Sequence, residues 1–400
     1  MRILAVSNLF PPYWIGGYEQ IAGWVAEGLR ERGHEVNVLT GRGPALMGNP
    51  SITTALDLDL PSLVEMNRGN GISSTGGLAG QFRQSVFNSH NLKASRAAIA
   101  AFRPDLVSFW NMSFVTFSPL WAARLSRIPA VLHLSDVAAN PFRNPHAPAF
   151  PAVLRAAARW TVDGVLRAAR PARFVVPSRF LRDRMVEREG LPADRVDVLH
   201  WPVEPSISRS APEALRGRPA RRFLFVGALV PEKGPQVLLA AFREALRGRP
   251  DLTLSFAGTG PRAYVAELQA AAGGLPVRFL GRLERRETTA AYREHDALVL
   301  PSIWDEPFAV VPLEAMALGL PVIATAAGGT GEAVVHERTG LLVPPRDPAA
   351  LGAAILRLAA DPPLAASLAR SGQSWARGTL SFPMFMDRLE RLYEGALRSA

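Results

Sequence analysis

The sequence predicts an α/β protein built from two doubly wound, Rossmann-like domains that face each other across a cleft. The chain has 400 residues, which is long for one domain and sufficient for two. Short apolar runs alternate with amphipathic helical patterns, and this alternation requires crossover connections and a parallel sheet. It stops in a proline-rich stretch at 201–221 and then begins again. The two series of strands and helices therefore predict two domains.

The first series contains a well-defined first helix and several short strands. The helix is expected at Tyr18–Arg32, because its apolar residues repeat at helical spacing and Gly33 follows it. The segment Gly41–Gly80 is rich in Gly, Ser, Asn and Pro and receives no assignment. The predicted strands are Arg2–Ser7, Glu35–Thr40, Asp105–Trp110, Ala130–Leu134, Arg173–Val176 and Arg195–Leu199.

The second series repeats the same alternation. Its predicted strands are Phe223–Val226, Leu252–Phe256, Pro276–Leu280, Ala297–Leu300 and Pro321–Ala324. Its predicted helices are Val237–Leu246, Ala309–Leu318, Ala349–Ala360 and Phe382–Leu397. In doubly wound domains ligands bind where strands end and helices begin, so the turns after these strands are the places to search for function.

These patterns define four parts of the chain. Residues 1–205 form the expected N-terminal domain, and residues 206–220 form a linker rich in proline. Residues 221–378 form the expected C-terminal domain. Residues 379–400 form a helix that we expect to be able to pack back on the N-terminal domain.

Composition excludes several classes of protein. Hydrophobic residues make up 48% of the chain, so most of it is expected to fold around cores, and no run of eighteen apolar residues predicts a membrane span. Cysteine is absent, which excludes disulfides, thiolate zinc sites and cysteine nucleophiles. The N-terminal residues lack the pattern of a signal peptide, so we expect a cytoplasmic protein.

The formal net charge is +10, and nearly all of the cations are arginine, with lysine only at Lys93 and Lys233. The stretch Arg143–Arg195 holds eleven arginines and five acids. Such a stretch attracts phosphates of nucleic acid or of an anionic membrane, and a solvated helical face explains it equally well. No aromatic–basic RNA motif is present, so we do not expect nucleic acid. Peripheral association with the inner face of the cytoplasmic membrane remains an alternative.

The strongest chemical pattern runs from Trp304 to Glu314. It follows a predicted strand and opens a predicted helix, and its carboxylates at Glu306 and Glu314 stand eight positions apart. The start of a helix offers unpaired N–H groups and positive dipole charge, which suit a phosphate. Carboxylates beside it can accept hydrogen bonds from sugar hydroxyls. The competing interpretation is that both acids are solvated surface residues.

The same region resembles a known family. From Glu306 the chain reads Glu-Pro-Phe-x-x-x-x-Leu-Glu-Ala-Met-Ala-x-Gly-x-Pro-Val-Ile-Ala-Thr, which resembles the signature of the retaining family 4 glycosyltransferases with the GT-B fold. Further segments resemble the family in the same order: Pro11-Pro12 with Gly16-Gly17, Gly33–Val36, Phe225–Gly227, Pro231–Gly234, Phe279–Gly281, Pro301-Ser302, Gly328-Gly329 and Thr339–Val343.

The resemblance implies that residues 1–205 are the acceptor-side domain and that residues 221–378 bind the nucleotide-sugar. Glu314 would hold the ribose of a nucleotide, and Glu306 would hold hydroxyls of the donor sugar. Lys233 would neutralise the diphosphate, for which an ammonium point charge suffices. Backbone N–H groups facing the diphosphate and sugar would come from Phe308, Ala309 and Val310.

It also implies roles for residues in other turns. Gly16 and Gly17 would let the backbone approach the phosphate closely, because glycine has no Cβ. Gly227 would line the donor site, and Arg282 and Leu283 would contact the base through their backbone. In the N-terminal domain, Asp136 would lie near the reaction centre.

Three positions depart from the family pattern. Ala228 stands where an arginine usually follows the glycine, which leaves more of the diphosphate charge to Lys233. Ser135 stands at the position of a common histidine, and whether His133, two residues earlier, acts in its place is open. Ala309 replaces a common glycine and adds a methyl group beside the expected sugar pocket.

The expected activity is transfer of a sugar, typically a hexose, from a UDP-type or GDP-type donor to a glycan, lipid or small-molecule acceptor, with retention of anomeric configuration. No cofactor is expected. No metal is expected either, although Asp57-Leu58-Asp59 matches a metal-binding Asp-x-Asp pattern. The alternatives are a non-catalytic GT-B scaffold and a sugar-nucleotide epimerase. The sugar, the base, the acceptor and the oligomeric state are not specified by the sequence.

Overall fold

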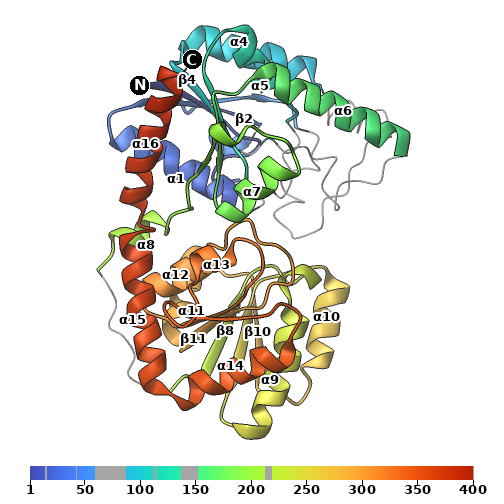
Figure 1. Cartoon of the computed structure of the whole chain (residues 1–400), viewed down its shortest axis with the longest axis vertical. Helices are drawn as coiled ribbons and strands as arrows, with labels where there is room; N and C mark the ends of the chain where they lie inside the picture. Colours follow the sequence, from blue (N-terminus) through green and yellow to red (C-terminus); the bar gives the residue numbers. More distant parts are fainter. Residues whose placement is uncertain are drawn as a thin grey trace. The chain divides into compact units, whose positions relative to one another are not determined.

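The chain folds into two compact units, one formed by Met1–Leu199 with Met386–Ala400 and the other by His200–Phe385. The computed structural model describes residues 1–13, 16–41, 43–58, 87–110, 112, 115–136, 152–211 and 219–399 (Figure 1). Each unit is an α/β domain with a parallel sheet, so the predicted fold class is confirmed. Part of the expected linker forms a short helix, α8 (Pro205–Arg209).

The first unit contains a seven-stranded parallel sheet in the order β3-β2-β1-β4-β5-β6-β7. All six strands predicted in this half are present, and each differs from its predicted bounds by two residues or fewer. The additional strand, β3, lies in the segment without an assignment and pairs with β2 at the sheet edge. The strands are β1 (Arg2–Val6), β2 (Glu35–Gly41), β3 (Ile52–Leu56), β4 (Leu106–Phe109), β5 (Ala130–His133), β6 (Arg173–Val176) and β7 (Val196–Val198).

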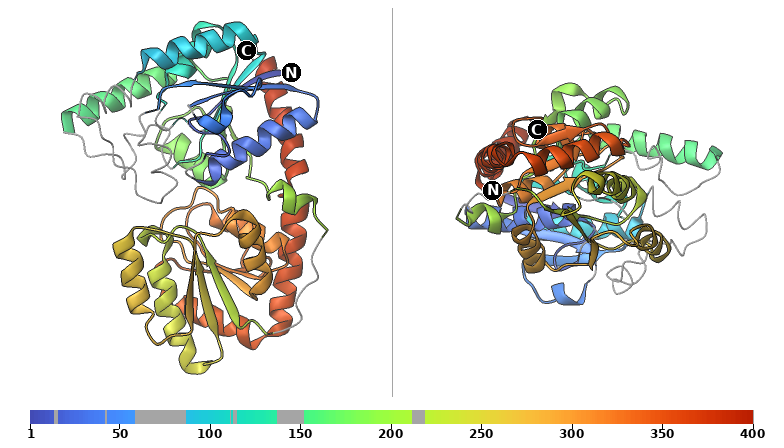
Figure 2. Two further views of the ribbon diagram at one scale, coloured as in Figure 1. Left: turned by 180° about the vertical axis from the view of Figure 1, so that it is seen from behind. Right: turned by 90° about the horizontal axis from the view of Figure 1, so that it is seen from below.

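Helices cover both faces of this sheet (Figure 2). One face packs its core against α4 (Ser89–Phe102), α5 (Ser118–Leu125), α6 (Ala152–Ala169) and α7 (Arg179–Glu187). Successive strand residues point to opposite faces, so Leu4 and Val6 belong to this core while Ile3 and Ala5 point the other way. The short 3₁₀ helices are η1 (Pro44–Leu46) and η3 (Ala193–Arg195).

The opposite face carries α1 (Gly17–Glu31) and the end of α16 (Phe382–Arg398). Tyr393 of α16 is fully buried, and its hydroxyl lies 2.6 Å from Ser108 Oγ of β4. Nearer its start, α16 binds α1 through Arg32, whose Nη1 donates to Asp387 Oδ1 and Glu390 Oε2 at 2.7 Å each. These contacts attach the end of the chain to the first sheet.

The second unit contains a six-stranded parallel sheet in the order β10-β9-β8-β11-β12-β13. The five predicted strands are present, and β13 is an edge strand of three residues that was not predicted. The strands are β8 (Arg222–Val226), β9 (Thr253–Ala257), β10 (Val277–Gly281), β11 (Ala297–Leu300), β12 (Val322–Thr325) and β13 (Leu341–Val343).

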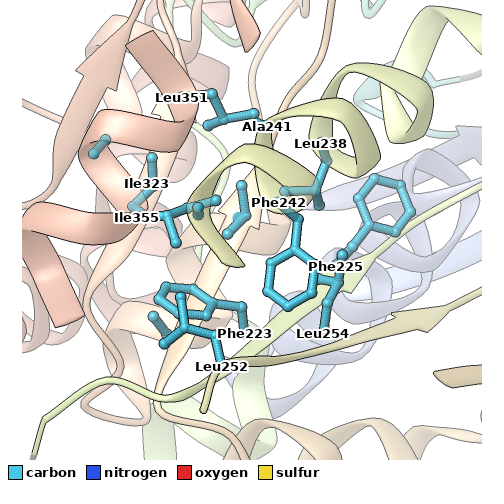
Figure 3. Packing of buried hydrophobic residues seen from close by; sticks show 14 of the residues in the cluster. Phe223, Phe225, Leu238, Ala241, Phe242, Leu252, Leu254, Ile323, Leu351 and Ile355 are labelled. Carbon is cyan, nitrogen blue, oxygen red and sulfur yellow. The ribbon is translucent and has the colours of Figure 1, made fainter. Parts of the chain in front are cut away.

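Two hydrophobic clusters sandwich this sheet. Figure 3 shows Phe223 and Phe225 of β8 packed with Leu238 and Phe242 of α9, and the same cluster includes Leu351 of α14. The cluster on the other face includes residues of α11, α12 and α15. The helices are α9 (Pro235–Gly248), α10 (Arg262–Ala271), α11 (Arg285–Glu294), α12 (Val311–Ala317), α13 (Thr330–Ala333), α14 (Pro348–Ala360) and α15 (Pro362–Gly378), with the 3₁₀ helix η4 (Pro231–Lys233).

Within the described part of the chain, no single helix is both long enough and apolar enough to cross a membrane. The pair Pro348–Ala360 and Pro362–Arg398 meets the length and composition criteria only together, and it is bent by 101°.

A buried histidine lies at the end of β5. The ring of His133 stacks on Trp110 with centroids 3.9 Å apart and an interplanar angle of 11°. Its Nε2 lies 3.2 Å from the Tyr393 hydroxyl, and the residue is 6% exposed. Burial lowers the pKa of His133 to about 3, so the ring is neutral at neutral pH.

This pKa predicts an acid-labile first unit. Between pH 6.5 and 3 the unfolded chain protonates this histidine while the folded chain does not, so stability falls as pH falls through that window. At pH 5 the loss amounts to about 2 kcal/mol relative to pH 7. We expect His133→Gln to remove that part of the pH dependence in urea unfolding followed by tryptophan fluorescence. His90→Gln, which changes an exposed histidine of α4, is the control. An unchanged pH dependence in His133→Gln would contradict the assignment.

Candidate functional site

The turns that leave three strands of the second sheet are joined at its carboxyl edge. The N–H of Ile303, after β11, donates to the carbonyl of Glu232, after β8, at 2.9 Å. The N–H of Gly329, after β12, donates to the carbonyl of Glu306 at 2.6 Å. Gly328 has a φ of +57°, and an added Cβ would overlap the backbone of Glu306, so only glycine fits there. The loop that carries Glu306 is therefore fixed from both sides.

Lys233 and Glu306 form an ion pair at this edge. The Lys233 Nζ donates to Glu306 Oε1 at 2.7 Å and to Oε2 at 3.0 Å. Ser302 Oγ also donates to Glu306 Oε1, at 2.5 Å, and Thr325 Oγ1 donates to the carbonyl of Ser302 at 2.5 Å. Glu306 is 6% exposed, whereas the Lys233 side chain is 31% exposed. The buried carboxylate thus accepts three hydrogen bonds, and one N–H of the ammonium group is left for a further acceptor.

Glu314 lies in a second charged cluster. It projects from α12, and its Oε1 accepts from Arg285 Nη1 at 2.9 Å while its Oε2 accepts from the Tyr292 hydroxyl at 3.1 Å. Arg285 also pairs with Glu204, and both glutamates are nearly buried. Burial, and then the Glu314 carboxylate, raise the pKa of Tyr292 well above its ordinary value. Tyr292 therefore remains a hydrogen-bond donor to Glu314.

The helix after Glu306 begins later than predicted. We expected it from Ala309, but α12 begins at Val311, with Val310 as its N-cap. Pro312 has no N–H and fits the first turn, where no intrahelical bond is required of it. A start at Ala309 would place Pro312 where its N–H should bond the preceding turn. Among the described residues, the N–H groups of Phe308, Ala309 and Val310 have no hydrogen-bond acceptor.

Aromatic packing holds this loop. The Phe308 ring stacks on His200, with centroids 5.2 Å apart and an interplanar angle of 14°. It is perpendicular to the Trp201 ring, with centroids 6.5 Å apart. His200 Nε2 lies 3.0 Å from Glu332 Oε2. Phe308 is 2% exposed, so its side chain belongs to the packing and only its backbone can face a ligand.

The remaining predicted residues of the second unit also follow strand ends. Gly227 follows β8, and its N–H donates to the carbonyl of Ala257 at 3.0 Å. The next residue, Ala228, is exposed and contributes no charge. Arg282 and Leu283 follow β10; Arg282 is exposed, and Leu283 packs against the hydrophobic cluster that contains α12.

Gly16, Gly17 and Asp136 belong to the first unit. Gly16 is the N-cap of α1, and its N–H donates to Glu19 Oε2 at 3.0 Å. A Cβ added at Gly17 would meet no atom within 4 Å, so the structure leaves open space there. Asp136 is exposed just beyond β5. These residues follow β1 and β5, which lie on either side of β4 in the sheet.

His133 lies beside this group, in an aromatic cluster. The Tyr18 hydroxyl donates to the His133 carbonyl at 2.8 Å, and Tyr18 packs against Trp110 with ring centroids 5.8 Å apart. Because its ring is buried and neutral, His133 has the environment of a packed core histidine. Ser135, at the position of the usual histidine, is partly exposed.

No group of three or more His, Asp or Glu side chains in the described ranges is arranged to hold a metal ion. Of the two acids in the Asp-x-Asp pattern, only Asp57 is described, and its N–H donates to Asn91 Oδ1 at 2.7 Å. Asp59 lies outside the described residues.

Sequence reasoning missed three side chains that organise the site: Ser302, which binds Glu306, and Arg285 and Glu204, which extend the Glu314 cluster. Ser302 belongs to Pro301-Ser302, which resembles the family and stands four positions before Glu306, so this segment could have identified it as a site residue. No feature of the sequence identified Arg285, because it is one of many arginines and lies 29 positions from Glu314.

Two sequence models of known families match the chain and together span most of it. Residues 15–207 match the family described as Glycosyltransferase Family 4, and residues 212–375 match Glycosyl transferases group 1. The "Glycogen synthase" of Mycobacterium tuberculosis is 29% identical over 394 residues, which cover 93% of this chain and 89% of that protein.

Solved structures share the architecture. The sucrose-phosphate synthase of Thermosynechococcus elongatus superposes with a TM-score of 0.76 at 21% identity, covering 100% of both chains. Anabaena HepE in complex with UDP gives a TM-score of 0.72 at 21% identity, covering 98% of this chain and 100% of that one. With both halves matched and the fold shared along its length, the chain belongs to the family 4 glycosyltransferases and has the GT-B fold.

Proposed function

We propose that the protein is a retaining hexosyltransferase that takes its sugar from a UDP-type or GDP-type donor and binds that donor at the carboxyl edge of the second sheet. The observation that carries the proposal is the Lys233–Glu306 pair, because Glu306 stands two residues before Phe308–Val310, whose N–H groups have no acceptor among the described residues. The UDP seen in the structural relative HepE supports a nucleotide diphosphate as the ligand.

In the proposed donor site, different protein groups bind the diphosphate, the sugar and the ribose of the donor. The diphosphate accepts from the free N–H of Lys233 and from the backbone N–H groups before α12, where donors already aimed at the charge cost little reorganisation. The sugar hydroxyls donate to Glu306, which Ser302 holds in place. The ribose hydroxyls donate to Glu314, and Gly227, Arg282 and Leu283 line the remaining part of the donor site.

The proposed reaction breaks the bond between the anomeric carbon and the diphosphate oxygen. The electron pair leaves with the diphosphate, whose growing negative charge Lys233 and the N–H groups stabilise. The acceptor hydroxyl oxygen bonds the anomeric carbon from the same face, and its proton passes to the departing phosphate oxygen. From the first unit we assign Gly16 and Gly17 to donor binding, where a backbone without Cβ can approach a phosphate closely, and Asp136 to the reaction centre. The acceptor is a glycan, a lipid or a small molecule, and we propose that the reaction needs neither a metal ion nor a cofactor.

The first test is nucleotide binding. Calorimetric titration with UDP and GDP should detect one of them, and Lys233→Ala should weaken that affinity by roughly tenfold or more, because a charge-assisted contact is lost. Glu314→Ala should also weaken it, because the ribose loses its acceptor. Lys93→Ala, at the other lysine of the chain, is the matched control.

The outcome also separates the alternatives. If the protein binds no nucleotide diphosphate, the enzyme proposal fails. Binding without transfer or hydrolysis of any common nucleotide sugar, assayed in EDTA, indicates a scaffold. Conversion of the sugar without its release indicates an epimerase.

A second test concerns Glu306. Replacing it by alanine frees Lys233 from its ion pair, so affinity for the nucleotide diphosphate should stay equal or rise. Turnover should fall by about 10²-fold, because the sugar loses a charged hydrogen-bond acceptor in the transition state. Glu306→Gln keeps the shape of the side chain and loses its charge, so its turnover should lie between that of the wild type and that of Glu306→Ala. A parallel loss of affinity and turnover would remove Glu306 from the sugar position.

We further propose that the arginine-rich stretch Arg143–Arg195 contacts an anionic membrane from the cytoplasmic side. Its residues from 152 onward include α6, where Trp160 is 79% exposed and follows the exposed Arg159. An exposed tryptophan beside arginine is typical of a surface that binds the lipid–water interface.

Vesicles containing phosphatidylglycerol should retain the protein at low salt and release it at high salt, because salt screens exposed charges. Trp160→Ala should weaken retention by roughly tenfold, since a large apolar ring no longer enters the interface. Met47→Ala, at another exposed apolar residue of the first unit, should change nothing. Retention that ignores lipid charge would leave the stretch as a solvated face.

A further inference from the structure

The first unit contains a second charged feature that the donor site does not use. A cavity of about 640 Å³ is lined by residues at the amino edge of its sheet, where β5, β6 and β7 begin and where α5, α6 and α16 end. Its volume is within the range of small-molecule sites. The charged residues described in its lining are Arg124, Arg127, Arg170, Arg173, Arg195 and Asp194.

Most of these guanidinium groups lack a compensating carboxylate. Arg173 is used in the structure, because its Nη1 donates to the Asp194 carbonyl at 2.8 Å and lies 3.5 Å from Asp197 Oδ2. Within the described ranges, no ion pair or side-chain hydrogen bond is made by Arg124, Arg127, Arg170 and Arg195. Five cations thus converge on one cavity against a single lining acid.

We propose that this cavity binds a phosphorylated ligand, an anion that carries at least two negative charges on phosphoryl oxygens. Guanidinium groups present planar pairs of donors that match phosphate oxygens, and several of them around one cavity suit a group with many acceptors. The site is distinct from the donor site in residues and in the sheet edge it occupies, and the inference does not depend on the proposed glycosyltransferase reaction.

An adjoining cavity indicates what else the ligand can carry. This cavity, of about 300 Å³, shares Arg170 and Arg195 with the first. Its lining combines the apolar Leu166, Phe174 and Leu191 with the charged Asp163, Arg167 and Glu189. An apolar substituent on the phosphoryl group fits such a lining. The phosphoryl group is therefore either that of a soluble metabolite or the head group of a lipid, and both sources share the chemistry of the arginine cavity.

A structural role for the arginines is the competing explanation. Arg124 lies in the last turn of α5, where a cation favours the negative end of the helix dipole. Arg127 and Arg170 follow α5 and α6 with φ values of +55° and +45°, a conformation that glycine adopts with less strain. Replacing these two by glycine thus removes two guanidinium groups without demanding a new backbone conformation.

The test measures pyrophosphate binding to the full chain by calorimetry. The variant Arg127→Gly/Arg170→Gly should bind pyrophosphate at least tenfold more weakly, because charge-assisted contacts disappear. The melting temperature of this variant should not fall. Lys233→Ala should keep this binding, which separates the cavity from the donor site. Arg103→Gly/Arg346→Gly is the matched control, because both arginines have positive φ, are exposed and lie outside the cavity.

A vesicle-binding experiment distinguishes a soluble phosphorylated ligand from a lipid head group. Pyrophosphate binding that Arg127→Gly/Arg170→Gly loses supports a soluble ligand. If pyrophosphate does not bind, retention on phosphatidylcholine vesicles with phosphatidic acid, but not on phosphatidylcholine alone, supports a lipid head group, provided that the same variant loses it. The proposal is overturned if the wild type binds neither probe, or if the control pair loses as much binding as the cavity pair. A lower melting temperature with unchanged binding also overturns it, in favour of the structural role.

Discussion

The burial of the Glu306 carboxylate is the constraint on which the carboxyl edge of the second unit depends. A carboxylate that is 6% exposed is costly unless charged and hydrogen-bonding partners surround it. Here the partners come from two turns, Lys233 after β8 and Ser302 after β11, and Thr325 of β12 fixes Ser302 in turn. Three adjacent strands therefore end in one hydrogen-bonded unit, and its geometry cannot change at one loop without disturbing the others.

The charge balance of this edge shapes how it would receive a diphosphate. Two of its cations, Lys233 and Arg285, are already paired with acids, and the nearly buried Glu204, Glu306 and Glu314 outnumber these two. Position 228 adds no cation. A diphosphate bound here would therefore rely on the unpaired backbone N–H groups before α12 and on the one free N–H of Lys233. Backbone donors have fixed directions, so such a site would favour a ligand whose oxygens match them over a mere concentration of negative charge.

Most of the fold could be predicted because the central strands are buried on both faces and read as short apolar runs between helical patterns. Strand β3 was not predicted because its residues are mostly half-buried at a sheet edge. Strand β13 was not predicted because it has only three residues. Helix α15 was not predicted, although its two leading prolines fit the first turn of a helix. Of the candidate site, the family pattern located Glu306, Glu314 and Lys233 but not Glu204. Arg285 could not be located either, because pairing across 29 residues in an arginine-rich chain leaves no local trace.

The two edges of the first sheet differ in a way that its topology explains. At the carboxyl edge, the ends of β4 and β5 are covered by a neutral cluster of Tyr18, Trp110, His133 and Tyr393, which is held by stacking and hydroxyl contacts. The helices of a parallel α/β sheet run back to the amino edge and end there with unpaired carbonyl groups and negative dipole charge. That charge accommodates cations, so arginines gather where α5 and α6 end. Once more of them converge than the helix ends and the single lining acid can balance, the excess positive charge is available to an anion from outside the chain.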